Sequence, residues 1–266
     1  MPKKLCNFTK VPSPSHAAHG PLPLPKERKN SLRRSPIILI LLSTLGVLIL
    51  ASLGIWQIAR LQWKTALIEQ VNQRVQAPAI AAPEPSQWPS VNAKGDAYLH
   101  VYARGTFLHD HETLVRAATE HGAGYWVMTP LQTDAGYILF INRGFVPPEN
   151  RDAMTRAAGQ IKGPVTVTGL LRMTEPKGAF LRRNNPADGR WYSRDVNAMA
   201  SAQGLRNFAP YFIDADSTPN PGGLPVGGLT VINFQNNHLV YAITWFTLAL
   251  LLAVTTIMFI NEKNRL

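Results

Sequence analysis

The chain has 266 residues, a single cysteine and a formal net charge of +11. A single cysteine excludes an intramolecular disulfide and a thiolate metal cluster within one chain. The positive charge lies mainly in a tail, because residues 1–35 carry eight basic residues against one acidic residue, whereas residues 61–237 carry 16 basic and 14 acidic residues. A nucleic-acid-binding protein would carry such charge as a stripe on a folded domain. The pattern therefore argues against nucleic acid as a partner and favours a membrane protein with a basic cytoplasmic side.

Residues 1–35 are predicted to be a disordered basic cytoplasmic tail. Five prolines between positions 12 and 25 prevent a regular helix, and the basic residues suit weak attraction to anionic lipid. A transit peptide is the alternative, but such peptides are amphipathic and rich in arginine, without a run of prolines.

Residues 36–59 are predicted to form the first transmembrane helix, because Pro36 suits a first helical turn and no charge follows before Arg60. A signal peptide is the alternative, but its apolar region would span only about 7–15 residues and end at a small-residue cleavage site. Trp56, Arg60 and Trp63 recur at helical spacing, so residues 60–77 are expected to extend this helix out of the bilayer. The same residues also fit an interfacial anchor belt.

Residues 60–237 are predicted to form one extracytoplasmic, β-rich domain. After a Pro/Ala linker at 78–89, segments rich in β-branched and aromatic residues predict strands near 98–108, 112–118, 125–132, 137–142, 165–173, 190–194 and 210–213. Residues 134–136 predict a hairpin turn, Asp195 is expected to cap a helix that ends at Gly204, and a second short helix is expected over 149–158. These elements predict an α+β domain, mainly antiparallel β, whose sheet can close as a barrel.

Residues 238–260 are predicted to form the second transmembrane helix, followed by a cytoplasmic tail at 261–266. No charge occurs between Leu239 and Ile260, a length that crosses a hydrocarbon core of about 30 Å. Two spans and an inside basic tail place both termini in the cytoplasm and the main domain outside. The retained tail predicts a bacterial inner membrane with a periplasmic domain, and the mitochondrial inner membrane is the alternative.

The usual catalytic motifs are absent from the sequence, which has no phosphate loop, dinucleotide-binding glycines, H-E-x-x-H or nucleophile elbow. No enzyme is therefore predicted. His238, Tyr241 and Trp245 share one helix face at the membrane rim. The His238 imidazole suits either a hydrogen bond to a neighbouring carbonyl or axial ligation of haem iron.

Three further groups are candidates for binding. Arg143 can pair with a carboxylate of a partner or form an internal salt bridge. Arg182, Arg183 and Trp191 suit a surface for protein or lipid headgroups, or else belong to a hairpin whose Trp191 fills the core. The run from His109 to Glu112 can supply metal ligands, although a polar turn explains it more simply.

Four motifs together resemble the surfeit locus protein 1 family, the membrane-bound assembly factors of cytochrome c oxidase. They are Gly54-x-Trp56-Gln57-x-x-Arg60 with Trp63-Lys64, Asn142-Arg143-Gly144-x-Val146-Pro147, Asn185-Pro186 followed by Trp191-Tyr192 and Asp195, and Asn237-His238-Leu239-x-Tyr241-Ala242-x-Thr244-Trp245-Phe246. Phe145 stands where tryptophan is expected and Val240 where glutamine is common, but neither departure touches His238.

The resemblance implies a non-enzymatic role in oxidase maturation, in which the protein holds haem a or delivers it to the largest oxidase subunit. It implies His238 as the haem axial ligand, and we expect Trp56 and Tyr241 as walls of the haem site and Arg60 near a propionate. The implied partners are the largest oxidase subunit, other assembly factors and membrane lipid. A cofactor-free scaffold for oxidase subunits is the alternative, and an envelope sensor is a third interpretation.

Overall fold

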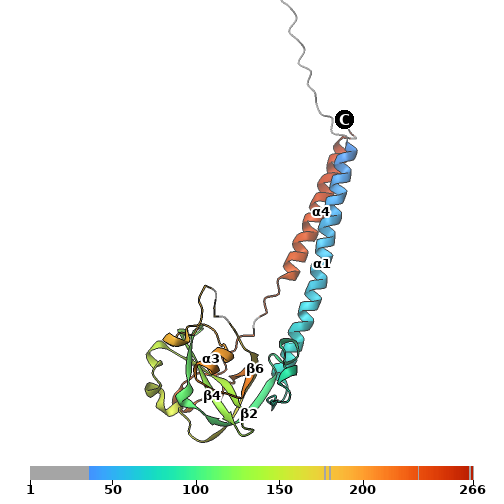
Figure 1. Cartoon of the computed structure of the whole chain (residues 1–266). Coiled ribbons are helices and arrows are strands. Elements are labelled where there is room, and N and C mark those ends of the chain that lie inside the picture. Colours follow the sequence, from blue (N-terminus) through green and yellow to red (C-terminus); the bar gives the residue numbers. More distant parts are fainter. Residues whose placement is uncertain (1–35, 177, 180, 233, 264, 266) are drawn as a thin grey trace, which may run out of the picture.

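The computed structural model describes residues 36–176, 178–179, 181–232, 234–263 and 265 (Figure 1). The predicted tail at 1–35 lies outside these residues. Two long helices, α1 (Pro36–Gln76) and α4 (His238–Lys263), lie side by side and lead to one β-rich domain. Both helices are long and apolar enough to cross a membrane. The chain is therefore a membrane protein with two candidate spans that flank an α+β domain, as predicted.

Helix α1 is much longer than a bilayer requires. Its 41 residues at about 1.5 Å each give roughly twice the thickness of a hydrocarbon core. Its C-terminal part carries Arg60, Lys64, Glu69 and Arg74 and reaches the domain, where the Arg74 Nη2 donates to the Lys94 carbonyl at 2.8 Å. Because Val71 is also buried, the end of α1 is fixed to the domain by both packing and hydrogen bonds.

The domain is built on a closed five-stranded barrel. Its strands pair in the order β2–β6–β7–β5–β4 and back to β2, with β5–β7 as the one parallel pair in that ring. Strand β3 extends the sheet beyond β4, and β1 pairs with β2 in parallel. The strands are β1 (Ile80–Ala81), β2 (His100–Phe107), β3 (Thr113–Thr119), β4 (Gly122–Thr133), β5 (Ile138–Val146), β6 (Pro164–Met173) and β7 (Phe208–Ala215).

Two apolar clusters stabilise the domain, one on each face of the barrel wall. The first includes Leu131, Leu139, Leu171 and Ile213, all fully buried. The second includes Met128, Phe140, Trp191, Met199 and Phe212, and it packs helix α3 (Val196–Ala202) against the barrel. All nine residues of β5 are buried, because this central strand is covered on both faces. Burial of this kind contributes about 25 cal/mol per Å² of apolar surface.

The short helices follow from local capping. The Asp195 carboxylate accepts from the Ala198 N–H at 3.1 Å and begins α3, as predicted, and Gly204 follows the helix with φ of 66°. Within the described part of the chain, the other helical pieces are α2 (Ala93–Asp96) and six 3-10 turns: Trp88–Ser90, His109–His111, Pro148–Asn150, Ala153–Gly159, Pro186–Asp188 and Pro221–Gly223.

Three local expectations differ from the structure. Residues 190–194 form only isolated bridges, because the Asn184 side-chain oxygen, and not a neighbouring strand, accepts from Tyr192 N–H and Ser193 N–H. The helix expected over 149–158 is two 3-10 turns, since Asp152 caps the second at Met154 and interrupts the first. The linker at 78–89 contains β1.

Candidate functional site

The strongest candidate site lies where α4 begins beside α1. The His238 Nδ1 is 2.7 Å from the Gln57 Oε1, and Gln57 is buried between the helices. An amide oxygen can only accept, so a hydrogen bond to the Gln57 Oε1 requires the tautomer with its proton on Nδ1. In the neutral ring, this tautomer leaves a lone pair on the His238 Nε2. A metal-ligating histidine has this arrangement, with one ring nitrogen donating to a fixed acceptor and the other free for the metal.

Small residues let the two helices approach closely enough for this contact. A Cβ on Gly54 would lie 2.7 Å from the Phe246 ring, which is closer than atoms can pack. Ala242 and Ala249 of α4 are buried against α1. Small side chains at such positions are typical of helix pairs in membranes. The Gly54 and Phe246 positions of the two motifs are therefore explained by packing.

Trp56 of α1 and Tyr241 of α4 lie on one flank of the helix pair. Around α1 the side chains follow the order Gly54, Gln57, Arg60, Trp56, and around α4 the order is Phe246, His238, Tyr241. Gly54 contacts Phe246, and Gln57 contacts His238. Arg60 and Trp56 of α1 and Tyr241 of α4 therefore lie on the flank of the pair that is opposite the Gly54–Phe246 contact. Trp56 and Tyr241 are each about half exposed there (54% and 53%). The Arg60 guanidinium lies 4.7 Å from the centre of the Trp63 ring.

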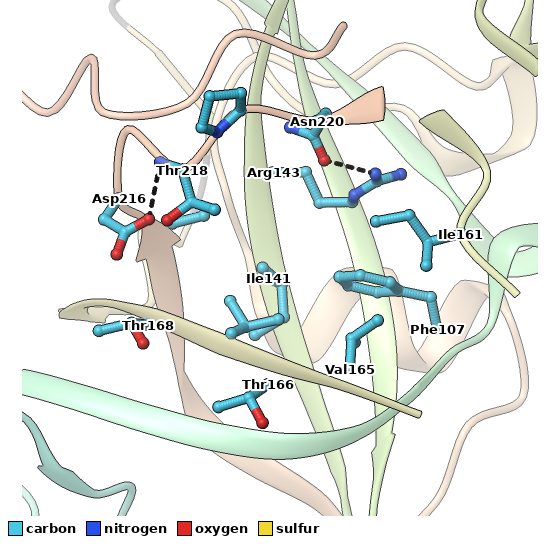
Figure 2. Close-up of a pocket in the computed structure, with 13 residues that line it drawn as sticks. Phe107, Ile141, Arg143, Ile161, Val165, Thr166, Thr168, Asp216, Thr218 and Asn220 are labelled. Carbon is cyan, nitrogen blue, oxygen red and sulfur yellow. Dashed lines mark hydrogen bonds between the residues drawn. The ribbon is translucent and has the colours of Figure 1, made fainter. Parts of the chain in front are cut away.

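A cavity of about 280 Å³ lies at one end of the barrel (Figure 2). Phe107, Ile141 and Val165 are among its apolar lining residues, and Thr166 and Asn220 are among the polar ones. Its volume is below the roughly 300–1,000 Å³ typical of pockets for drug-sized ligands. A haem-sized group therefore does not fit this cavity.

Arg143 borders the cavity, and its side chain joins β5 to the segments that contain Gly159 and Asn220. Its Nη2 donates to the Gly159 carbonyl at 2.6 Å and to the Asn220 Oδ1 at 2.8 Å, and its guanidinium stacks 4.7 Å from the centre of the Phe107 ring (Figure 2). Arg143 is only 2% exposed, and burial lowers its pKa to about 10. Its side chain is therefore not offered on the surface to a partner.

The neighbours of Arg143 explain the rest of its motif. The Asn142 Nδ2 donates to the buried Asp214 carboxylate at 2.8 Å, which joins β5 to β7. Gly144 has φ of 128°, and a Cβ there would lie 2.0 Å from the Val226 carbonyl. All three residues serve the scaffold.

Comparison with known proteins identifies the relatives of this chain. Residues 45–250 match the model of the SURF1 family. This chain belongs to the SURF1 family. It is 37% identical over 214 residues to human Surfeit locus protein 1, covering 74% of this chain and 69% of that protein. It is also 37% identical over 228 residues to a SURF1-like protein of Monosiga brevicollis, with coverage of 80% and 83%.

SURF1 proteins are known as a cytochrome c oxidase assembly family. The matched range includes the Gly54–Arg60 segment, the whole β domain and His238 with Tyr241. The helix rim therefore belongs to the part of the chain that defines the family.

The remaining candidates separate into exposed and buried residues. Arg182 and Arg183 are exposed, and the Arg182 guanidinium lies 5.5 Å from the centre of the Tyr192 ring. Trp191 is only 5% exposed and belongs to the second apolar cluster. This position agrees with the alternative interpretation of the segment, in which Trp191 fills the core.

The polar run at His109 folds as a turn. His109 Nε2 is 2.9 Å from the Ile161 carbonyl, and the Glu112 carboxylate pairs with buried Arg156. No group of three metal-ligating side chains with suitable geometry occurs among the described residues. The pairing of Gln57 with His238 was not anticipated from the sequence. The one sequence feature that pointed to Gln57 is its polarity. It lies on the membrane side of Trp63, where an interfacial anchor belt does not need an amide.

Proposed function

We propose that this chain binds haem a at the outer rim of α1 and α4 while cytochrome c oxidase is assembled, and holds it for, or delivers it to, the largest oxidase subunit. The Gln57–His238 hydrogen bond carries the proposal, because it leaves the His238 Nε2 free as an iron ligand. Membership of an oxidase assembly family supports the wider role.

The neighbouring side chains suit the remaining parts of such a group. Trp56 and Tyr241 present exposed aromatic surface close to the start of α4 and would provide walls for a flat apolar ring. Arg60 supplies a guanidinium for a propionate carboxylate. Haem would supply a redox-active iron, and the chain's own task is to hold and orient it without catalysing a reaction.

The proposed location follows from charge. The basic N-terminal tail favours the cytoplasmic side of a bacterial inner membrane, with the β domain in the periplasm. The rim with His238 then lies at the periplasmic face. In a mitochondrion the domain would lie in the intermembrane space.

A cofactor-free scaffold is the second candidate. The exposed flank with Trp56 and Tyr241 favours it, since a transmembrane helix of an oxidase subunit would cover the same aromatic surface.

Pigment analysis of the purified full-length chain separates the two functions. We expect wild-type protein from haem a-producing cells to absorb in the Soret region. We expect His238→Ala to lose most of that absorbance. We expect His121→Ala to keep it, because His121 is exposed on the β domain and distant from His238 in the sequence. If His238→Ala retains all haem with an unchanged spectrum, the ligand assignment is wrong. If wild-type protein carries no haem but co-purifies with the largest oxidase subunit, the scaffold function is correct.

A further inference from the structure

An exposed leucine beside two arginines marks the connection between β6 and α3. Leu181 is 89% exposed, the largest exposed fraction among the described large apolar side chains, and Arg182 and Arg183 follow it directly. In Figure 1 this connection leaves the body of the domain on the side of α4. A single exposed leucine is common on protein surfaces, and the features that distinguish Leu181 are its fixed backbone and the positive charge beside it.

Hydrogen bonds order this connection and hold Leu181 at its surface. The Asn184 side chain accepts from two backbone N–H groups, of Tyr192 at 2.8 Å and Ser193 at 3.1 Å. The Ser193 Oγ accepts from the Asn184 Nδ2 and from the Gly178 N–H, both at 3.0 Å. The Arg182 N–H closes a tight turn on the Ala179 carbonyl at 3.0 Å, which sets Leu181 in the left-handed region with φ of 59°. Such backbone strain in a residue other than glycine is tolerated only where the surrounding structure fixes it.

Positive charge gathers beside Leu181 without acidic partners. The Arg116 and Arg182 guanidinium groups both approach the Tyr192 ring, at 5.9 and 5.5 Å from its centre. Neither they nor Arg183 forms an ion pair with an acid among the described residues, whereas Arg104, Arg156, Arg172, Arg190 and Arg194 all do. These exposed guanidinium groups are therefore available to an anion from outside the domain.

We propose that one surface of the domain binds the anionic phospholipid headgroups of the membrane that anchors the chain. This basic loop surface consists of Leu181, Arg182, Arg183, Arg116 and Tyr192. Guanidinium groups match phosphate oxygens, and a single apolar tip inserts at the boundary between headgroups and acyl chains. Two helices keep the domain beside the bilayer at all times, so the headgroups are present at high local concentration. An acidic protein segment has the same charge but gives no reason for an apolar tip in water.

Contact with lipid would fix how the domain is oriented on the membrane. The domain is attached through α1 and through the connector that precedes α4. A third contact at the basic loop surface would stop rotation about these attachments. The rim around His238 would then keep one flank open to an incoming partner.

A fluorescent label at position 181 tests the proposal directly. Replacing the single cysteine by Cys6→Ser allows Leu181→Cys to be labelled alone with an environment-sensitive fluorophore. The full-length chain is then reconstituted into vesicles of phosphatidylcholine with about a third phosphatidylglycerol. We expect the label to emit as in an apolar environment and to be quenched by brominated acyl chains. A label at Met154→Cys, which is 79% exposed but belongs to the 3-10 turn Ala153–Gly159, should stay in water.

Charge variants show whether the anionic headgroups hold the basic loop surface at the membrane. Neutralising both arginines with Arg182→Gln and Arg183→Gln should lower the ratio of bound to unbound label by roughly 25-fold, or about fivefold for each arginine near an anionic surface. High salt should act in the same direction. A label at 181 that remains as aqueous as the label at 154 in anionic vesicles overturns the proposal. Equal quenching in pure phosphatidylcholine overturns the role of the headgroup charge.

A protein partner would give a different result. If the fluorophore at 181 stays in water in vesicles, and a photo-crosslinker attached to the same cysteine reacts only with a protein in native membranes, the basic loop surface binds protein and the lipid proposal is wrong. None of these measurements depends on haem, so they are independent of the function proposed for His238.

Discussion

Gln57 decides which nitrogen of His238 is free, and its effect can be measured. Gln57→Leu removes the acceptor at nearly constant volume, so the proton can move to Nε2 and block it. We expect haem affinity to fall by roughly 10–100-fold, the usual effect of removing a hydrogen-bond partner from a metal-ligating histidine. Gln57→Glu keeps an acceptor and should retain haem. Haem titration of the apoprotein gives the affinity. Gln62→Leu, on an exposed position of α1, is the control, and equal affinities for the two leucine variants would contradict this role.

Glu112 neutralises a buried guanidinium. The Arg156 side chain is 1% exposed and the Glu112 side chain 10%, and the Arg156 Nη1 donates to the Glu112 Oε2 at 2.9 Å. Glu112→Ala leaves Arg156 charged and unpaired, so we expect a loss of about 3–5 kcal/mol in the free energy of unfolding. Denaturant unfolding of the full-length chain in detergent measures it. Glu120→Ala, whose carboxylate is 78% exposed, should change stability by less than about 0.5 kcal/mol. Similar losses for both variants would show that the pair is not responsible.

At the scale of elements, Gly54 sets the distance between α1 and α4. Gly54→Val would push its side chain into the Phe246 ring and should cost about 1–3 kcal/mol, as overpacking does. Because the same displacement separates Gln57 from His238, haem content should fall as well. The double variant Gly54→Val/Phe246→Ala should recover part of both. Thermal unfolding and Soret absorbance provide the measurements. Ala59→Val, on an exposed position of α1, should match wild type, and a Gly54→Val variant that also matches wild type would rule out this packing argument.

The sequence predicts elements better than it predicts pairs of residues. Alternating burial along β2 and the Asp195 cap of α3 are local, so the predicted barrel and helix are confirmed. The Gln57–His238 contact joins residues 181 positions apart. It depends on the rotation of one helix relative to the other, which spacing within a single helix does not determine. The sequence leaves two interpretations of Trp191 open for the same reason, since its place in the core depends on α3 and β3.

At the scale of the whole domain, buried tyrosines predict loss of stability at alkaline pH. The Tyr211 hydroxyl donates to the Pro83 carbonyl at 2.6 Å and fastens the segment after β1 to the barrel. Burial raises the pKa of Tyr211 well above its ordinary value, and burial also raises the pKa of Tyr137. The folded state therefore holds these protons more tightly than the unfolded chain. The resulting stability is complete below the unfolded pKa of about 10 and is lost as the pH rises above it.

Tyr211→Phe should remove much of this pH dependence. The variant loses one hydrogen bond, about 1 kcal/mol at neutral pH, but its free energy of unfolding should fall less between pH 9 and 11 (about one unit either side of the unfolded pKa). Urea unfolding at a series of pH values measures both effects. Tyr102→Phe, on an exposed position of β2, should keep the wild-type pH dependence. An unchanged alkaline slope in Tyr211→Phe would assign the loss of stability to other groups.

The topology of the whole molecule can be tested with its own cysteine. Positive charge is concentrated before α1, so the N-terminal tail with Cys6 should remain in the cytoplasm. A membrane-impermeant maleimide should therefore label wild-type protein in bacterial spheroplasts only after lysis. Met154→Cys in a Cys6→Ser background should be labelled at once, because position 154 is exposed on the domain beyond both helices. Labelling of Cys6 in intact spheroplasts would reverse the proposed orientation. The His238 rim would then face the cytoplasm, and haem would have to reach it from that side.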